Sequence, residues 1–363
     1  GGHVRLIFVT QVLDRSDAVL GFVSRWVEAF ARECERVRVV ALEVGDTSGL
    51  PANVDAVALG RTGRVRRFLR YRRALTGAFR EGFDGLLTHM VPRYSTLAAP
   101  YARRAGVPHF LWYTHKGVDR RLLAAIEVVD GVFTASEESL RVDTPKRIVT
   151  GHGIDADHFE ADRVPDPNGR IRLLSVGRVT PAKDPLTVVE AVGRLREDGR
   201  DVSLTWAGGA LAPGDEEYGA LVQRAVEGRG LEGAVRFAGA VPYPDVPALY
   251  RSADVFVNAS RTGSVDKVVL EAMAARLPFV TCNESIPPLL EDVLPRSDVL
   301  DHVSFGVGDS ASLAERLARV IDEPASARAA RSGALHEYVR TRHNVDDLVA
   351  RLVDHMARAR HSS

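Results

Sequence analysis

Cysteine and an imbalance of charge are what this sequence most conspicuously lacks. Its 363 residues include two cysteines, Cys34 and Cys282, which lie far apart and each in an apolar setting. We expect buried free thiols in a reducing compartment, because a disulfide framework needs many closely placed cysteines. Lys plus Arg and Asp plus Glu both number 48, so the formal net charge is zero. A neutral chain has no molecule-wide positive field, and we expect no nucleic-acid partner.

Long apolar runs are absent as well. No stretch approaches the roughly 18 consecutive apolar residues that a membrane-spanning helix needs. No signal peptide is visible, since the first residues lead directly into a strand pattern. The sequence therefore predicts a cytoplasmic protein.

Short apolar runs alternate with helical patterns through the whole chain. Hydrophobic residues make up 45% of the sequence, which is enough for two cores, and the length favours two domains. Alternation of this kind is typical of parallel sheets covered by helices. The fold class expected is α/β, with two Rossmann-like domains and a ligand cleft between them. The expected strands are 5–10, 37–42, 54–59, 85–88, 110–113, 132–134, 147–150, 172–176, 203–207, 235–238, 255–257 and 279–281.

The apolar rhythm lapses once, across residues 155–169. This stretch is rich in aspartate and contains two prolines, a composition typical of a linker. We therefore expect one domain over residues 1–160 and a second over 161–340. Residues 341–363 are expected to form a C-terminal helix that packs back toward the first domain.

A carboxylate and two cations follow predicted strands of the second domain. Glu271 is expected in about the first turn of the helix after strand 255–257, where it could accept paired hydrogen bonds from a ribose diol. It could equally complement the helix macrodipole. Arg178 and Lys183 follow strand 172–176 and precede a helix that begins near Asp184, a setting that suits a diphosphate. The alternative is a pair of solvated cations in a loop.

Four ordered segments resemble the retaining, nucleotide-sugar-dependent glycosyltransferases of family 4. They are IVTGHGIDADHF (148–159), SVGRVTPAKDP (175–185), VRFAGAVPYPDVPALYRSADVFV (235–257) and VVLEAMAARLPFV (268–280). The resemblance is strong over about 148–280 and weak before it. It implies the GT-B fold, in which the N-terminal domain faces the acceptor and the C-terminal domain holds the nucleotide sugar.

The resemblance also implies roles for individual residues. Arg178 and Lys183 would neutralise the donor diphosphate and the charge that grows on it. Glu271 would bind the ribose. Backbone near Val269 and Leu270 would contact the phosphates, and backbone near Gly239 and Val241 would face the base.

Two departures from the family pattern affect the sugar site and a turn. Gly263 stands where the family usually carries a glutamate that contacts the donor sugar. Asp266 could replace that glutamate, or the loop backbone at Gly263 and Ser264 could. His152 stands where the family usually has asparagine, and no role is assigned to it.

Three residues of the N-terminal half are further candidates for the sugar or the donor phosphates. His89 follows a short buried strand and resembles the family's histidine near the sugar, where it would donate or accept a hydrogen bond. His115, after the next strand, is the second candidate. Gly21, at a helix start, would let that helix approach the phosphates. The alternatives are a structural histidine and simple close packing at Gly21.

The implied reaction is transfer of a hexose from a nucleotide diphosphate donor, UDP- or GDP-linked, to a hydroxyl acceptor. The substitution would be front-face and would retain the anomeric configuration. No cofactor or metal is expected, because no paired carboxylates stand at a strand end. Two other readings stay open: a GT-B-fold nucleotide-sugar 2-epimerase and a non-catalytic nucleotide-sugar-binding protein.

The stretch from Arg61 to Arg80 carries eight arginines and no acidic residue. Its apolar residues could form one side of a helix that lies on anionic lipid at the inner face of the membrane. The alternative is a solvated basic face that guides anionic substrates.

Overall fold

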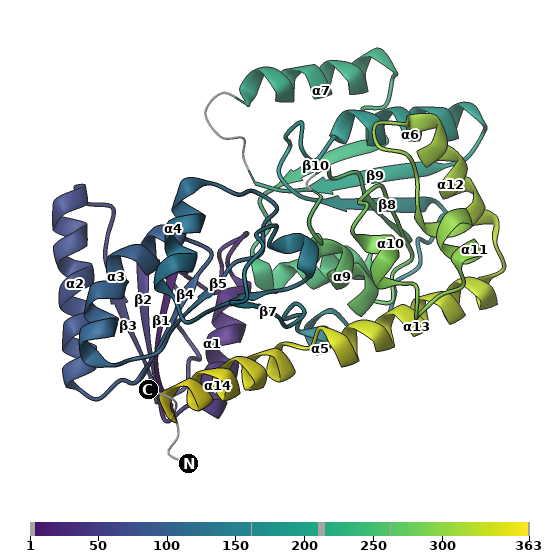
Figure 1. Ribbon diagram of the computed structural model, residues 1–363. Coiled ribbons are helices and arrows are strands. Elements are labelled where there is room, and N and C mark those ends of the chain that lie inside the picture. The colour runs from purple at the N-terminus through teal and green to yellow at the C-terminus, as the bar shows by residue number, and fades with distance from the viewer. Residues whose placement is uncertain (1–3, 161, 210–214, 262, 362–363) are drawn as a thin grey trace. The chain divides into compact units, whose positions relative to one another are not determined.

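The computed structural model describes residues 4–160, 162–209, 215–261 and 263–361 (Figure 1). Parallel strands joined by helices form two compact units, one of Gly1–Gly153 with His343–Ser363 and one of Ile154–Arg342. The expected division fell between Glu160 and Ala161, and Ala161 lies outside the described residues. The units divide at Gly153 instead, before the polar stretch that reads as a linker.

The first unit, here called unit 1, contains a sheet of seven strands. Their order is β3-β2-β1-β4-β5-β6-β7, and all neighbours pair in parallel. The strands are β1 (Arg5–Leu13), β2 (Arg36–Val44), β3 (Val54–Ala58), β4 (Gly85–His89), β5 (His109–Trp112), β6 (Gly131–Thr134) and β7 (Arg147–Val149).

Helices cover both faces of this sheet. Leu6 and Phe8 face one core, and Ile7 and Val9 face the other, because successive side chains of a strand point to opposite faces. The first core contains α1 and α14; the second contains α2 and α3, which lie side by side in Figure 1. The helices of unit 1 are α1 (Phe22–Glu33), α2 (Arg64–Arg80), α3 (Pro92–Ala105), α4 (Arg120–Val128), η1 (Glu137–Ser139) and α14 (Val345–His361).

Helix α14, the last helix of the chain, is part of the core of unit 1. Leu348, Val349, Leu352 and Met356 are fully buried and recur at helical spacing on the face toward α1 and the sheet. A segment nearly two hundred residues from β7 therefore completes the unit that the N-terminal half begins.

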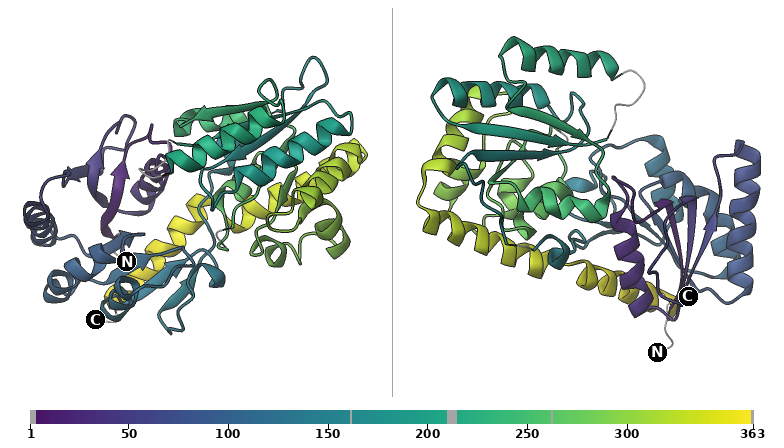
Figure 2. Two further views of the ribbon diagram at one scale, coloured as in Figure 1. Left: turned by 90° about the horizontal axis from the view of Figure 1, so that it is seen from above. Right: turned by 180° about the vertical axis from the view of Figure 1, so that it is seen from behind.

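The second unit, here called unit 2, contains a parallel sheet of five strands in the order β10-β9-β8-β11-β12. Helices α6, α7 and α12 cover one face, and α8, α9 and α13 cover the other (Figure 2). The strands are β8 (Ile171–Val176), β9 (Val202–Ala207), β10 (Val235–Gly239), β11 (Val255–Asn258) and β12 (Phe279–Thr281). The helices are α5 (Ala156–Phe159), α6 (Pro185–Glu197), α7 (Glu216–Gly228), η2 (Tyr243–Asp245), α8 (Val246–Arg251), α9 (Lys267–Ala274), α10 (Ile286–Leu289), α11 (Arg296–Asp298), η3 (Val299–Val303), α12 (Ser310–Asp322) and α13 (Ala325–Arg342).

The expected α/β class and every expected strand are confirmed, with shifts of one to three residues at strand ends. The largest shift is in β1, which continues to Leu13 where a loop was expected after Thr10, because Val12 and Leu13 still pair with β2. Both cysteines are buried free thiols, and burial raises the pKa of Cys34 to about 12 and of Cys282 to about 11.

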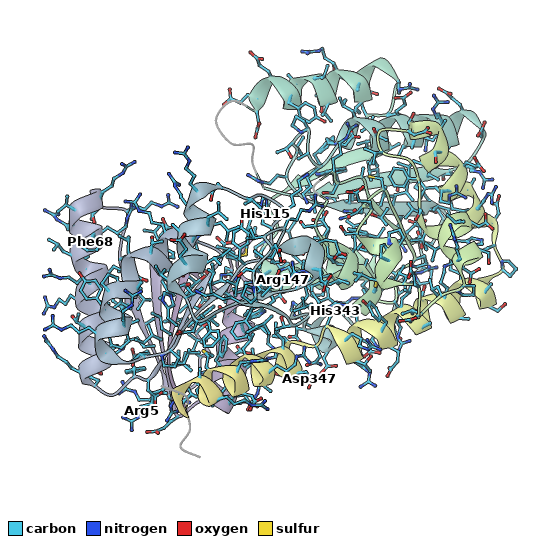
Figure 3. The ribbon with its side chains drawn as sticks, viewed as in Figure 1. Arg5, Phe68, His115, Arg147, His343 and Asp347 are labelled. Carbon is cyan, nitrogen blue, oxygen red and sulfur yellow. The ribbon has the colours of Figure 1, made fainter. Side chains whose placement is uncertain are left out.

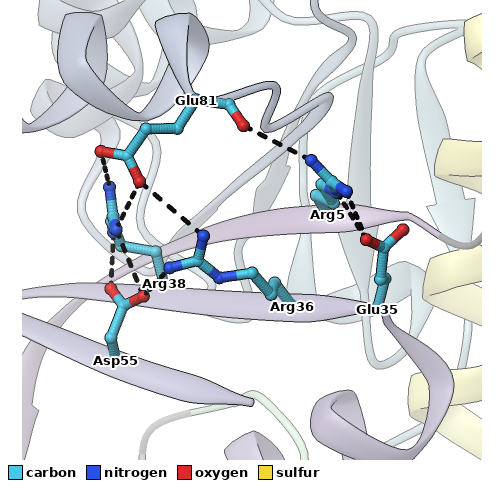
Figure 4. Close-up of polar contacts among 6 residues, drawn as sticks. All are labelled: Arg5, Glu35, Arg36, Arg38, Asp55 and Glu81. Carbon is cyan, nitrogen blue, oxygen red and sulfur yellow. Dashed lines mark hydrogen bonds and ion pairs between the residues drawn. The ribbon is translucent and has the colours of Figure 1, made fainter.

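A network of ion pairs joins β2 and β3 to the end of α2 (Figure 4). Arg38 donates to Asp55 (2.5 Å from Nε) and to both oxygens of Glu81 (2.9 Å each). Arg36 donates to the same Asp55 at 2.8 Å. Both guanidiniums lie over the ring of Phe83, at 5.1 and 4.8 Å from its centroid. The arginines at this end of the sheet are thus neutralised by carboxylates of the unit itself.

Substitution of Leu352 by alanine is expected to destabilise unit 1. The side chain is fully buried between α14 and the sheet, so truncation should cost about 2–5 kcal/mol through lost burial and a residual cavity. The measurement is the unfolding free energy from urea titration. The control is Arg358→Ala on the same helix, where the side chain is 75% exposed and its ion pair with Asp354 lies at the surface, so that at most about 1 kcal/mol is expected. Equal losses in the two variants would contradict the packing of α14.

His109 is expected to make unit 1 sensitive to acid. It is buried, neither ring nitrogen has a hydrogen-bond partner among the described residues, and burial lowers its pKa to about 3. The unfolded chain binds more protons than the folded one between pH 6.5 and about 3, so stability falls as the pH falls through that window. The slope approaches about 1.4 kcal/mol per pH unit.

The variant His109→Leu tests this titration. Between pH 6.5 and 4.5 it should lose about 2–3 kcal/mol less unfolding free energy than the parent, measured by urea titration at each pH. Parallel stability profiles for the two proteins would show that His109 does not titrate in this way.

Candidate functional site

The strand order of unit 2 reverses direction between β8 and β11. The loops that follow these two strands leave the sheet toward opposite sides, which opens a crevice at the carboxyl ends of the strands. These loops are residues 177–184 and 259–266. Ligands of open parallel sheets bind at such switch points, and Arg178, Lys183, Gly263, Ser264 and Asp266 all belong to these two loops.

Lys183 and Asp266 meet across this crevice. The Lys183 Nζ lies 3.1 and 3.2 Å from the two carboxylate oxygens of Asp266, and 3.3 Å from the Ser260 Oγ. Both side chains are largely buried, with 24% and 14% exposed. Asn258 donates to the same carboxylate at 3.0 Å. The structure therefore brings together a residue predicted at the diphosphate and one predicted at the sugar.

A second ion pair crosses the same crevice one residue further along. Arg261 donates to Asp184 Oδ2 at 2.6 Å from Nη2 and 3.1 Å from Nε, and its amide donates to the Ala182 carbonyl at 2.8 Å. Asp184 also accepts from the Thr187 amide, so it begins helix α6 as an N-cap. The two loops are thus held together by two ion pairs and a backbone hydrogen bond.

Arg178 adds a positive charge that neither ion pair neutralises. Its side chain is exposed and forms no hydrogen bond or ion pair with a described residue. Three cations and two carboxylates, counting Arg178 with the two ion pairs, give the crevice a net charge of +1. The backbone beneath Arg178 is closely packed: a Cβ at Gly208 would lie 1.8 Å from the Gly177 carbonyl oxygen, so only glycine fits there.

A chain of hydrogen bonds holds the loop at Gly263 and Ser264. Ser285 Oγ donates to the Gly263 carbonyl at 2.8 Å, and Asn283 Nδ2 donates to the Ser264 carbonyl at 2.6 Å. Gly263 has a φ of 69°, the left-handed region that favours glycine. The position where the family usually carries a glutamate thus has a backbone conformation here that favours glycine.

Glu271 lies in α9, four residues after Lys267 at the start of the helix, and is 5% exposed. The Tyr250 hydroxyl donates to its Oε2 at 3.1 Å, and Lys267 Nζ lies 3.6 Å from its Oε1. Burial raises the pKa of Glu271 and lowers that of Lys267, and each charge partly offsets the shift of the other. Neither partner was predicted from the sequence, although Lys267 stands four residues before Glu271, the spacing of a helical ion pair.

The remaining donor candidates lie around this crevice. Val269 and Leu270 are buried in α9, and the Val269 amide donates to the Asp266 carbonyl at 3.1 Å. Gly239 ends β10 with a φ of 70°, and Val241 follows it, half-buried. Gly239 borders a cavity of about 630 Å³ beside α7, whose wall includes the aromatic rings of Trp206 and Phe237. Its size and aromatic lining suit a flat ring.

The sheet of unit 1 also reverses its strand order, between β1 and β4, and His89 stands at that point. Its Nδ1 lies 3.0 Å from the Thr10 Oγ1, which links the ends of the two strands. The rings of Phe8, Phe22 and Trp26 surround the imidazole at centroid distances of 5.7–6.1 Å, and 3% of the residue is exposed.

Backbone strain coincides with both switch points. Among the described residues, the non-glycine residues with left-handed φ are Met90 (64°), Asp184 (51°) and Arg276 (55°). Met90 directly follows His89, and Asp184 directly follows Lys183. Such conformations are costly for side chains other than glycine and cluster at functional sites.

The other residues of unit 1 that the sequence singled out are His115, Gly21 and His152. His115, labelled in Figure 3, is exposed, and its Nδ1 accepts from the Gly117 amide at 2.9 Å. Gly21 is buried at the start of α1, and its helical backbone (φ −56°) is a conformation that any residue can adopt. His152 is buried, and its amide donates to the His343 Nδ1 at 3.0 Å.

No group of three or more His, Cys, Asp or Glu side chains among the described residues could hold a metal ion. No described helix is long and apolar enough to cross a membrane.

Comparison with known sequences places the family resemblance in unit 2. Residues 170–323, somewhat less than half of the chain, match the family described as glycosyl transferases group 1. Glycogen synthase of Mycobacterium tuberculosis H37Rv is 34% identical over 180 residues, which are 50% of this chain and 41% of that protein. D-inositol 3-phosphate glycosyltransferase of Paenarthrobacter aurescens is 32% identical over 111 residues, 31% of this chain and 27% of that protein. The chain spans between 27% and 41% of the length of the curated relatives that it matches.

Solved structures are similar over nearly the whole chain. Anabaena HepE, in complex with UDP and glucose, has a TM-score of 0.78 at 16% identity, covering 98% of this chain and 100% of that one. Sucrose-phosphate synthase from Thermosynechococcus elongatus has a TM-score of 0.76 at 16% identity, covering 99% and 100%. At such low identity these likenesses establish the fold, which is of the GT-B type with two Rossmann-like halves.

Tyr250→Phe tests the setting of Glu271. Removal of the hydroxyl takes a hydrogen bond from a buried carboxylate, so we expect a loss of about 1–3 kcal/mol of unfolding free energy in urea titration at pH 7. Tyr101→Phe is the matched control, since the Tyr101 hydroxyl forms no hydrogen bond with a described residue; it should change stability by less than about 0.5 kcal/mol. An unchanged unfolding free energy in Tyr250→Phe would mean that the hydrogen bond from Tyr250 to Glu271 does not contribute to stability.

Proposed function

We propose that this protein is a retaining glycosyltransferase that transfers a hexose from a UDP- or GDP-linked donor to a hydroxyl acceptor. The observation that carries the proposal is the switch point of unit 2. There Arg178, Lys183 and Asp266 lie on the two loops where ligands of such sheets bind, inside the segment that matches glycosyl transferases group 1. Structural neighbours solved with UDP support a nucleotide donor.

The diphosphate would be held by Arg178 and Lys183. Arg178 is exposed and supplies the excess positive charge, and its planar guanidinium can donate two parallel hydrogen bonds to phosphate oxygens. Lys183 is oriented by Asp266, Ser260 and the loop around them, so its ammonium is in place before a ligand arrives. Positive charge held in advance stabilises the negative charge that develops as the glycosidic bond breaks.

The nucleoside would be held by α9 and by the cavity beside Gly239. Glu271 would accept hydrogen bonds from the ribose hydroxyls, and Tyr250 and Lys267 fix its orientation. The base would lie at the carboxyl end of β10, where Gly239 borders the cavity that Trp206 and Phe237 line. Backbone near Val269 and Leu270 would contact the phosphates, and backbone near Val241 would face the base.

The sugar would lie at the loop of Gly263, Ser264 and Asp266. In a front-face substitution the acceptor hydroxyl attacks the anomeric carbon from the side that the diphosphate leaves. The new glycosidic bond forms as the old one breaks, and the hydroxyl proton passes to the departing phosphate oxygen. This course retains the anomeric configuration and requires no nucleophile from the protein. His89 would hydrogen-bond the sugar or acceptor, with Thr10 holding its ring.

We further propose that the reaction needs no metal and occurs in the cytoplasm, with α2 in contact with anionic lipid at the inner face of the membrane. Fixed cations at the diphosphate, Arg178 above all, can supply the charge that a divalent ion supplies in other transferases. Helix α2 carries seven arginines and no acidic residue.

Arg178→Ala should weaken binding of UDP or GDP by roughly tenfold or more, because a charge-assisted hydrogen bond contributes about 1.5–3 kcal/mol. Isothermal titration calorimetry measures the dissociation constants. Arg236→Ala, an exposed arginine near the beginning of β10, is the matched control and should leave them unchanged. Equal affinities for the parent and for Arg178→Ala would place the nucleotide elsewhere.

The products formed from candidate nucleotide sugars distinguish the proposed reaction from its alternatives. In excess chelator we expect slow release of free nucleotide from the donor, and faster release when an acceptor is present. NMR of the product should show the same anomeric configuration, axial or equatorial, as the donor sugar has. Epimer formation would instead indicate an isomerase, and binding without turnover a binding protein. Complete loss of activity in chelator would contradict the metal-independent mechanism.

A further inference from the structure

A cavity of about 230 Å³ lies between α2 and α3 in unit 1. Its floor is formed by Leu42 in β2 and Leu59 directly after β3, so it opens near the carboxyl ends of these strands. Val91 forms part of its wall, and the Val91 amide donates to the His89 carbonyl at 2.8 Å. The cavity therefore reaches the chain two residues after the histidine at the switch point, whose ring lies on the opposite face of the sheet, among Phe8, Phe22 and Trp26.

Three arginines line this cavity. Arg64 and Arg67 come from the first turn of α2, and Arg93 from the first turn of α3. None of the three guanidiniums forms a hydrogen bond or ion pair with a described residue, and no carboxylate is among the described residues of the lining. Arg36 and Arg38 of the same unit differ in this respect, because Asp55 and Glu81 neutralise them (Figure 4).

The walls between the arginines are apolar and aromatic. Phe68, labelled on α2 in Figure 3, and Leu97 face the cavity together with Tyr71 and Tyr94, whose ring centroids are 5.7 Å apart. The Tyr71 hydroxyl donates to the Tyr94 carbonyl at 2.9 Å, so it is satisfied within the wall. Arg67 lies near enough to Tyr94 to lower the pKa of that phenol, partly offsetting the rise that burial causes.

The two helix starts reinforce the positive potential. Neither Gly63 before α2 nor Val91 before α3 caps its helix with a side chain, and neither first turn contains an acidic residue. Arginines at helix N-termini interact unfavourably with the macrodipole. An anion bound beside Arg64, Arg67 and Arg93 would interact favourably with these arginines and with both helix N-termini.

We propose that this cavity binds one molecule of an organic phosphate with an apolar body. The phosphate would bind Arg64, Arg67 and Arg93, which can offer paired N–H donors, and the apolar body would pack between Phe68, Tyr94 and Leu97. The site is a property of unit 1 and does not depend on the reaction. Only the identification of this ligand with the sugar acceptor, suggested by the position of the cavity near the carboxyl ends of β2 and β3, rests on the proposed function.

This site differs from the contact with lipid proposed for α2. The exposed residues Val65 and Leu69 of that helix, 74% and 47% exposed, are not part of the cavity lining. Contact with a vesicle surface would use the exposed side of α2 and depend on its arginines generally. The cavity would bind a soluble monomer and depend on the arginines that line it.

Isothermal titration of the full chain with monomeric octyl phosphate tests the proposal. We expect one site per chain, with affinity at least tenfold higher than for inorganic phosphate or octyl glucoside. Arg67→Gln and Arg93→Gln, on two different helices, should each weaken it at least fivefold. The control Arg73→Gln, an exposed arginine of α2 outside the lining, should leave it unchanged. Thermal unfolding of each variant shows whether the fold is kept.

Three outcomes would overturn the site. One is equal weakening by Arg73→Gln, which would indicate a general basic surface. Another is binding of inorganic phosphate as tight as octyl phosphate, which would indicate an adventitious ion only. The third is sedimentation with phosphatidylglycerol vesicles without binding of octyl phosphate, which would indicate a lipid surface. UDP titration of Arg67→Gln and Arg93→Gln should match the parent, so a failure of the donor proposal is recognised separately.

Discussion

The ion pair between Lys183 and Asp266 joins the two loops that leave the switch point of unit 2, and the arrangement of the candidate site depends on it. Without Asp266, a largely buried ammonium would lack its counter-charge, and without Lys183 the carboxylate would repel a diphosphate. The neighbouring pair of Asp184 and Arg261 repeats the connection one residue further on. Together they hold the loop backbone in place while leaving Arg178 as the excess cation.

In each unit, candidate site residues lie where the strand order reverses. In unit 2 this point holds the crossed ion pairs, and in unit 1 it holds His89 against Thr10. The strained backbone at Met90 and Asp184 lies directly after these residues. Site residues gather at such points in parallel sheets for a geometric reason. Two neighbouring strands there connect to helices on opposite faces, so the loops at their carboxyl ends are not covered by helices. The basic cavity of unit 1 also opens near the carboxyl ends of its strands, on the face of the sheet opposite the His89 ring.

Charge is used in two ways in unit 1. Arg36 and Arg38 are neutralised by Asp55 and Glu81 and pack over Phe83, so they stabilise the sheet end. Arg64, Arg67 and Arg93 line a cavity without a carboxylate. A net charge of zero over the whole chain hides this separation, since composition counts charges and says nothing of where they are opposed.

The sequence by itself determined the α/β class, every strand, the helix that begins after Asp184 and the loops that hold Arg178, Lys183 and Asp266. These follow from local apolar periodicity and from turn and cap residues, which act over a few positions. Only the tertiary structure decided that Lys183 pairs with Asp266, that Tyr250 holds Glu271, that the two units divide at Gly153, and that α14 completes the core of unit 1. Such contacts join segments up to hundreds of residues apart, and their partners are selected by packing and burial that no local pattern encodes.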